Sequence, residues 1–156
     1  MKGKEKVMLS FKEAVEATKE IATCYQTGLK ALGGYSLKIL ADEPKKCCGS
    51  VDIDYCVTKL YPQENRWDYA ICYDGEVYFV EVHSANTGEV STVLRKLRWL
   101  KDWLHEIAPD IFKLRVKSKT PFYWIQSNGN HILPNSKQAR QAAINGLKPV
   151  AVLKLP

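Results

Sequence analysis

The sequence has no apolar run near the roughly 20 residues that a helix needs to cross a bilayer, which excludes a membrane-spanning helix. The N-terminus is basic and lacks the apolar core of a secretory signal, so the expected location is cytoplasmic. The five cysteines have no regular spacing, which argues against a disulfide framework and favours reduced thiols. Internal repeats and low-complexity segments are also lacking, so residues 1–156 are expected to form one domain.

Metal-binding and nucleic-acid-binding signatures are equally scarce. Cys47, Cys48 and Cys56 invite a zinc hypothesis, but adjacent cysteines are awkward ligands for one tetrahedral ion, and no paired Cys-x-x-Cys spacing is present. The sequence also lacks a recognition helix, a zinc finger and the aromatic motif of RNA-binding sheets. Nothing in it indicates a base-specific mode of recognition.

Basic charge is what the sequence does have. The composition, 46% hydrophobic and 26% charged, is typical of a folded soluble protein. A net charge of +6 favours polyanionic partners such as nucleic acid, although a solvated basic surface is the alternative. Most of the clustered basic residues lie in the second half of the chain: Arg95, Lys96, Arg98, Lys101, Lys113, Arg115, Lys117 and Lys119.

Three segments precede the central part of the chain. A capping box of Ser10 and Glu13 predicts a helix, and apolar residues at helical spacing continue it through Leu29 to a glycine pair at 33–34. Residues 35–41 fit either a strand or an irregular extension. Alternation over residues 51–59 predicts the first strand, with its acidic side chains facing solvent.

The central segment, residues 67–84, reads as a β-hairpin. Asp74 and Gly75 separate two runs rich in β-branched and aromatic residues, and this dipeptide tolerates the positive φ of a tight turn. Asp68 and Glu81 occupy strand positions at similar distances from the turn. Carboxylates in apolar strands need a compensating cation or donor, so a metal site is one hypothesis and pairing with Arg66 is the other.

The rest of the chain alternates helices and strands. An apolar stripe predicts a helix from about residue 89 to Pro109, with Trp99 and Trp103 beside the stripe as core or covering aromatics. Residues 111–119 fit an edge strand or a basic loop. A strand over 122–126, a helix after Ser136 that stops at Gly146, and a strand over 150–153 complete an α/β fold with a mixed sheet flanked by helices on both faces.

This order of elements, with Asp68 on the second strand and Glu81 on the third, resembles the PD-(D/E)XK nuclease superfamily. The resemblance extends from Ser10 to Leu155 and implies a restriction endonuclease-like αβββαβ core. It implies a Mg²⁺- or Mn²⁺-dependent endo- or exonuclease that hydrolyses phosphodiester bonds of DNA or RNA. Asp68 and Glu81 match the metal ligands of that family, and His83 stands where the family has lysine.

The spacing of the motif suits the implied chemistry. Glu81 and His83 are two residues apart on a strand and so share a face, where Asp68 on the adjacent strand can meet them. One or two carboxylates plus phosphate oxygens and waters is the usual coordination of Mg²⁺. The basic residues expected to meet nucleic acid are Arg95, Lys96, Arg98, Lys117 and Lys119.

Histidine at position 83 departs from the family motif and leaves three alternatives. His83 substitutes for the lysine, Lys96 from the following helix takes over its role, or catalysis has been lost. In the last case the domain would bind nucleic acid or a protein partner without cleavage, and Arg66 or Lys96 between the two carboxylates would favour that alternative. A homodimer would suit an enzyme that cuts both strands of a duplex.

Overall fold

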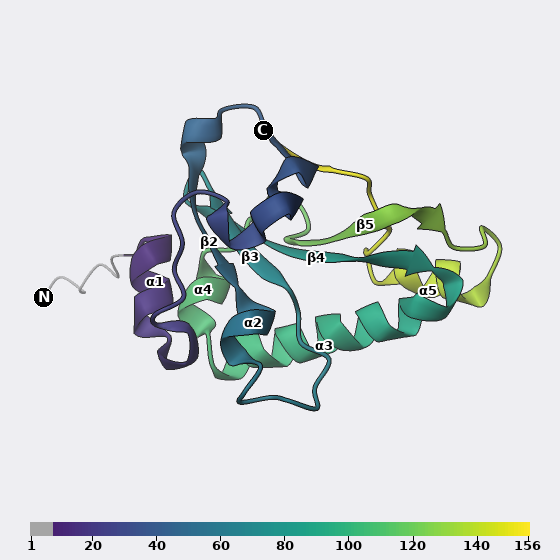
Figure 1. Ribbon diagram of the computed structural model, residues 1–156, viewed down its shortest axis with the longest axis horizontal. Helices are drawn as coiled ribbons and strands as arrows, with labels where there is room; N and C mark the ends of the chain where they lie inside the picture. Colours follow the sequence, from purple (N-terminus) through teal and green to yellow (C-terminus); the bar gives the residue numbers. More distant parts are fainter. Residues whose placement is uncertain (1–7) are drawn as a thin grey trace, which may run out of the picture.

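The computed structural model describes residues 8–156, which form a mixed α/β fold built on a four-stranded sheet (Figure 1). The strands are β1 (Ile39–Ala41), β2 (Cys47–Asp52), β3 (Tyr69–Tyr73), β4 (Glu76–Asn86), β5 (Phe122–His131) and β6 (Leu153–Leu155). The α-helices are α1 (Phe11–Ala17), α2 (Ile53–Val57), α3 (Val90–Glu106), α4 (Pro109–Lys113) and α5 (Lys137–Ile144). Four 3₁₀ segments connect them: Lys19–Ile21, Lys30–Lys38, Pro44–Lys46 and Thr87–Glu89.

The central sheet has the order β2-β3-β4-β5. β2 and β4 are both antiparallel to β3, whereas β4 and β5 run parallel and are connected through α3. A small second sheet pairs β1 with β6 in parallel. Apart from β1, the short helices α2 and α4 and the 3₁₀ segments, the elements from α1 to β5 follow the order α1-β2-β3-β4-α3-β5, which agrees with the predicted helix, three strands, helix and strand.

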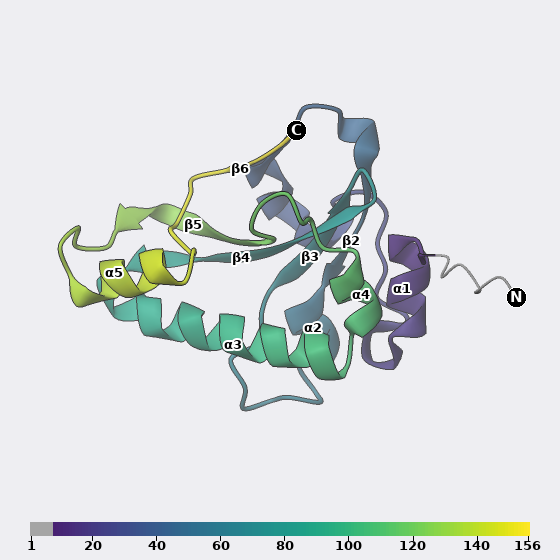
Figure 2. The ribbon, with the colours of Figure 1, turned by 180° about the vertical axis from the view of Figure 1, so that it is seen from behind.

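Alternating strand residues divide the core between the two faces of the sheet. Ala70, Cys72 and Phe79 belong to the same buried cluster as the apolar sides of α1 and α3. Ile71 and Val80 pack instead with the 3₁₀ segment Lys30–Lys38 and the β1–β6 pair. The long helix α3 thus runs along one side of the sheet and β6 lies on the other (Figure 2). Helices on both faces were expected, and the second face carries 3₁₀ turns and a small sheet instead.

The predicted hairpin is confirmed. Tyr73 pairs with Glu76 across a two-residue turn, in which Asp74 and Gly75 have φ values of 51° and 80°. A two-residue turn in which both residues have positive φ has a backbone twist that matches the twist of the flanking strands. The hairpin fixes the register in which Tyr69 opposes Val80, and so decides where Asp68 and Glu81 meet.

The first helix is much shorter than predicted. It ends at Ala17, because Thr18 adopts an extended conformation and turns its hydroxyl back to the carbonyl of Ala14 at 2.8 Å. The chain then passes through a 3₁₀ turn, after which Gln26 forms an isolated β-bridge with Ser50 of β2. The periodic apolar residues after Ala17 are therefore not on one helix.

Three later boundaries also differ from the sequence prediction. The first strand ends at Asp52, whose carboxylate accepts a hydrogen bond from Tyr55 N at 2.9 Å and caps α2, so residues 53–57 are helical. Residues 109–113 form α4 rather than an edge strand, and Lys117 and Lys119 lie in the loop after it. The last strand is shifted to residues 153–155, where it pairs with β1.

The expectation of reduced cysteines is wrong, because the structure contains two disulfides. Cys24 bonds to Cys56 with a Cα–Cα distance of 6.4 Å, and Cys48 bonds to Cys72 on the neighbouring strand with a Cα–Cα distance of 5.2 Å. Cys47 is free. Both pairings depend on tertiary register and not on spacing in the sequence, and they remove two of the three cysteines considered for zinc.

Replacing both Cys24 and Cys56 by serine is expected to lower the free energy of unfolding by about 3 kcal/mol, because this disulfide closes a sequence separation of 32 residues. Urea unfolding under non-reducing conditions measures the change. The matched control is Cys47→Ser, which removes a free thiol and should change stability by less than about 0.5 kcal/mol. Equal stability of the double variant and wild type would contradict this assignment.

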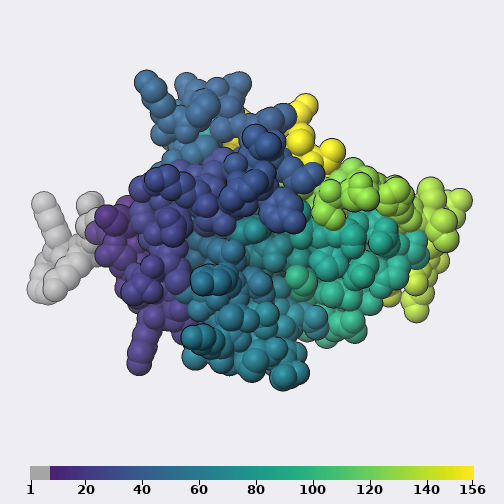
Figure 3. Space-filling view, viewed as in Figure 1, coloured from purple at the N-terminus to yellow at the C-terminus, as the bar shows by residue number. Residues whose placement is uncertain are grey.

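Within residues 8–156, no helix is long and apolar enough to cross a membrane. The basic N-terminal segment on which the cytoplasmic prediction rests lies outside the described residues, and that location stays a prediction. In the space-filling view, the ends of the molecule are formed by the early chain around α1 and the late chain around α5 (Figure 3).

Candidate functional site

Four segments bring charged side chains together at the N-terminal end of β3. Asp68 precedes β3, Glu81 and His83 lie on β4, Lys96 lies on α3, and Glu89 ends the 3₁₀ turn between β4 and α3. We call Asp68, Glu81 and Lys96 the carboxylate–lysine cluster. His83 and Glu89 border it.

The two carboxylates of the cluster are held by reciprocal backbone hydrogen bonds. Asp68 N donates to Glu81 Oε1 at 3.0 Å, and Val82 N donates to Asp68 Oδ2 at 3.0 Å. Asp68 lies one residue before the β3–β4 ladder begins, so its carboxylate and that of Glu81 satisfy amides that the ladder leaves unpaired. These bonds orient both acids without a ligand.

Lys96 supplies the cation that a buried carboxylate requires. The Glu81 side chain is fully buried, and Lys96 Nζ donates to Glu81 Oε2 at 2.7 Å. Lys96 Nζ also lies 4.0 Å from Asp68 Oδ1. Burial lowers the pKa of Lys96, but the charges of Glu81 and Asp68 outweigh that effect, so its pKa is raised and the ammonium form persists.

The pKa of Asp68 is raised to about 7, mainly by burial and then by repulsion from Glu81. Lys96 and the Val82 amide oppose this shift without cancelling it. Its side chain remains 20% exposed, and among the described residues no hydrogen bond reaches Oδ1. Asp68 is therefore a carboxyl group that can exchange a proton near neutral pH.

The raised pKa of Asp68 predicts a pH dependence of stability. Between the ordinary pKa of the unfolded chain and about 7, the folded state holds a proton that the unfolded state has lost, so stability falls as pH rises through this window. Asp68→Asn should remove roughly 1–3 kcal/mol of that decline between pH 5 and 8. Urea unfolding at several pH values measures it. Parallel pH profiles for wild type and variant would contradict the prediction.

His83 bridges the cluster to Glu89. Its Nδ1 lies 3.5 Å from Glu81 Oε2, and its Nε2 lies 3.1 Å from Glu89 Oε2. The contact with Glu81, followed by that with Glu89, raises the pKa of His83 although burial opposes the shift. Sequence reasoning missed Glu89 as a member of the site, because it stands at a helix start, where an acid is ordinary for other reasons.

Two other expectations about charged residues can be compared with the structure. Arg66 pairs with Asp54 at 2.8 Å, so the hypothesis that it neutralises Asp68 and Glu81 is wrong, and the Asp54 side chain, expected to face solvent, remains 40% exposed beside this partner. Arg95 and Arg98 are exposed on α3, the helix that carries Lys96.

Lys117 and Lys119 lie elsewhere. Val116, just before them, donates its amide to the carbonyl of Val77 near the turn end of β4, four residues before Glu81. Lys119 Nζ lies 5.5 Å from the ring centre of Tyr78. The structure therefore does not bring these two lysines into the carboxylate–lysine cluster.

The chain matches no family model, no curated protein and no solved structure. Among residues 8–156, no group of three or more His, Cys, Asp and Glu side chains is arranged to hold a metal ion.

Proposed function

We propose that this protein is a metal-dependent nuclease of the PD-(D/E)XK type, with Asp68 and Glu81 as the carboxylate ligands and Lys96 in the role of the motif lysine. The observation that carries the proposal is the meeting of the two acids across the hairpin, where Asp68 N donates to Glu81 Oε1 at 3.0 Å and Val82 N donates to Asp68 Oδ2 at 3.0 Å. Lys96, 2.7 Å from Glu81 and 4.0 Å from Asp68, supplies from the helix a cation that the strand position of His83 lacks. The α1-β2-β3-β4-α3-β5 order and the mixed sheet support a restriction endonuclease-like core.

Carboxylate oxygens are the donors that Mg²⁺ or Mn²⁺ would take here, and the ion would displace Lys96 Nζ from Glu81 Oε2, because Glu81 Oε1 already accepts a hydrogen bond from Asp68 N. Both metal ions prefer oxygen ligands, and Mg²⁺ in particular is commonly held by one or two carboxylates together with waters and substrate phosphates. Asp68 Oδ1 is free of hydrogen bonds from the described residues and partly exposed, and Glu81 lies across the same hairpin. A divalent ion held there would stabilise the negative charge that develops on a phosphodiester during in-line displacement.

The side chains of the protein would then have separate tasks. Lys96 keeps its proton, so it is suited to orient the attacking water and to stabilise negative charge, and not to act as a base. His83, whose pKa is raised by its contact with Glu81, is the group suited to proton transfer, because Asp68 and Glu81 must be ionised to hold a metal ion. Glu89 fixes the orientation of the His83 ring through its contact with Nε2. Exposed Arg95 and Arg98 on the same helix are suited to contact phosphates.

Cleavage by the wild-type protein tests the proposal. Single-stranded and double-stranded DNA and RNA are incubated with the full chain in Mg²⁺, in Mn²⁺ and in EDTA. We expect cleavage of at least one substrate in either metal and none in EDTA. If none of the four substrates is cleaved, or if EDTA leaves the cleavage unchanged, the proposal is contradicted.

A non-catalytic module that binds nucleic acid is the second candidate, and one observation favours it. The Lys96 ammonium already neutralises the carboxylates without a metal, as expected of an internal ion pair. This candidate predicts salt-dependent binding that survives Asp68→Ala and Glu81→Ala, because phosphate contacts depend on counterion release and not on these acids. The protein would then bind nucleic acid without cutting it.

A further inference from the structure

A hollow lies beside the C-terminal half of α3, next to the loop between α2 and β3. It has a volume of about 250 Å³. Ile107, three aromatic and three acidic side chains line it, the latter six being Tyr61, Trp99, Trp103, Glu64, Asp102 and Glu106. None of them belongs to the carboxylate–lysine cluster, so the proposed nuclease chemistry does not account for this hollow.

The aromatic rings form two walls at nearly a right angle. Trp99 and Trp103 are stacked, with ring centres 5.7 Å apart and planes inclined by 15°. Tyr61 stands against Trp99 at 76°, with ring centres 5.4 Å apart. Trp103 is almost completely buried, whereas Tyr61 and Trp99 are partly exposed. A face of an aromatic ring that is open to the hollow attracts cations.

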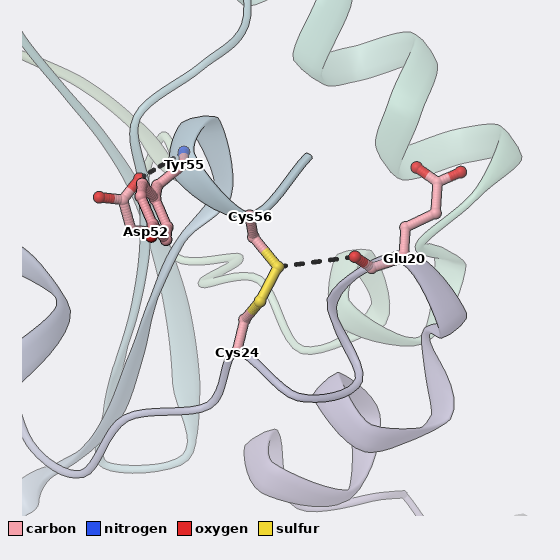
Figure 4. Close-up of a disulfide and its surroundings, with 5 residues drawn as sticks. All are labelled: Glu20, Cys24, Asp52, Tyr55 and Cys56. Carbon is pink, nitrogen blue, oxygen red and sulfur yellow. Dashed lines mark hydrogen bonds between the residues drawn. A yellow bond between two sulfur atoms is a disulfide. The ribbon is translucent and has the colours of Figure 1, made fainter. Parts of the chain in front are cut away.

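The Glu20 carboxylate holds two of the rings in place. Glu20 accepts hydrogen bonds from Tyr61 Oη at 2.9 Å and from Trp103 Nε1 at 3.0 Å. Its side chain points away from the nearby Cys24–Cys56 disulfide, whose Cys56 sulfur contacts the Glu20 carbonyl at 3.6 Å (Figure 4). The rings are therefore oriented before any ligand arrives, which lowers the entropy cost of binding.

The hollow carries negative charge on a protein whose net charge is +6. Among residues 8–156, Glu20, Glu64, Asp102 and Glu106 have no Lys, Arg or His partner within ion-pair distance. Burial, the hydrogen bond to Glu20 and the charge of Glu106 together raise the pKa of Tyr61 to about 12, so its hydroxyl remains a donor to Glu20. The carboxylates attract cations over a longer range than the aromatic rings do, so the two attractions add.

We propose that this hollow binds an organic cation, namely an alkylated ammonium group. A volume of about 250 Å³ lies below the range of sites for drug-sized ligands and suits a single head group. Aromatic faces provide no ligand atoms for a metal ion, but they complement the methyl groups and diffuse charge of a quaternary ammonium. The ammonium group could belong to a small ammonium compound or to a modified lysine side chain, which share this chemistry.

Titration of the full chain with choline tests the proposal, with tryptophan fluorescence as the signal. A neutral isostere of choline, 3,3-dimethylbutan-1-ol, is titrated in parallel, and so is a peptide that contains trimethyllysine. We expect saturable binding of choline with a Kd of about 1 mM, and binding of the isostere at least about tenfold weaker. Tighter binding of the peptide than of choline would identify a modified lysine side chain as the source of the ammonium group. Tighter binding of choline would identify a small ammonium compound as the source.

Two variants and a control assign the binding to this hollow. Trp99→Leu should weaken choline binding about tenfold, and Glu106→Gln about fivefold. Glu16→Gln removes an exposed carboxylate on α1 and should leave the Kd unchanged. Equal binding of choline and its isostere, no saturable binding of choline or the peptide, or an unchanged Kd in Glu106→Gln would overturn the proposal. None of these measurements depends on cleavage of nucleic acid.

Discussion

Replacing Glu81 by glutamine is expected to slow metal-dependent cleavage of nucleic acid by at least about a hundredfold. Even residues that only support a metal ligand cost 10-fold to 100-fold when they are removed, and Glu81 is proposed as a ligand itself. Glutamine keeps an oxygen that can accept the hydrogen bond that Asp68 N donates to Glu81 Oε1 at 3.0 Å. The substitution therefore removes charge with little change of shape, and initial rates in Mg²⁺ and Mn²⁺ measure its effect.

The matched control for this variant is Glu76→Gln. Glu76 lies on the same strand, is exposed and has no contact with the cluster, so its replacement should leave the rate within about twofold of wild type. Circular dichroism and thermal unfolding of both variants establish that they are folded. If the two variants cleave at the same rate, Glu81 has no role in the reaction.

Replacing Lys96 by methionine is expected to lower the free energy of unfolding by about 3–5 kcal/mol at pH 7. The Glu81 side chain is fully buried and Lys96 Nζ is its cationic partner at 2.7 Å. Removing one member of a buried ion pair leaves the other charge without compensation, which costs far more than an exposed pair is worth. Urea unfolding at pH 7 measures the loss.

A double variant and a second lysine make this test specific. In Lys96→Met with Glu81→Gln both charges are gone, so the double variant should be more stable than Lys96→Met alone. The control is Lys101→Met on the same helix, where Nζ lies 5.4 Å from the ring centre of Phe122 and the expected loss is below about 1 kcal/mol. Equal losses for the two lysine variants would contradict the buried ion pair.

Local sequence signals predicted the parts of the fold that depend on neighbouring residues. The Asp74-Gly75 turn, the apolar stripe of α3 and the cap at Ser136 each have their cause within a few residues, and the structure contains all three. The Ser10 capping box likewise begins α1 as predicted. Where the determining contact is distant, prediction was wrong. The chain after Thr18 is directed by a bridge between Gln26 and Ser50, which no helical pattern can reveal.

The candidate site shows the same division. Asp68 and Glu81 are brought together by the register of one hairpin, so their approach could be anticipated from the turn. A role for Lys96 beside Glu81 was only one of three alternatives that the sequence left open. Glu89 was not anticipated, and Glu20 contacts Trp103 across 83 positions of sequence, a pairing that depends on how α3 packs.

A crystal of the wild-type protein soaked in Mn²⁺ tests the central claim most directly, because the anomalous signal of manganese locates the ion without reference to activity. The account predicts an anomalous peak within coordination distance of both Asp68 and Glu81, with Lys96 Nζ moved from its 2.7 Å contact with Glu81. A map without a peak at the two carboxylates under saturating Mn²⁺, with Lys96 still bound to Glu81, would contradict it and identify the cluster as an internal ion pair.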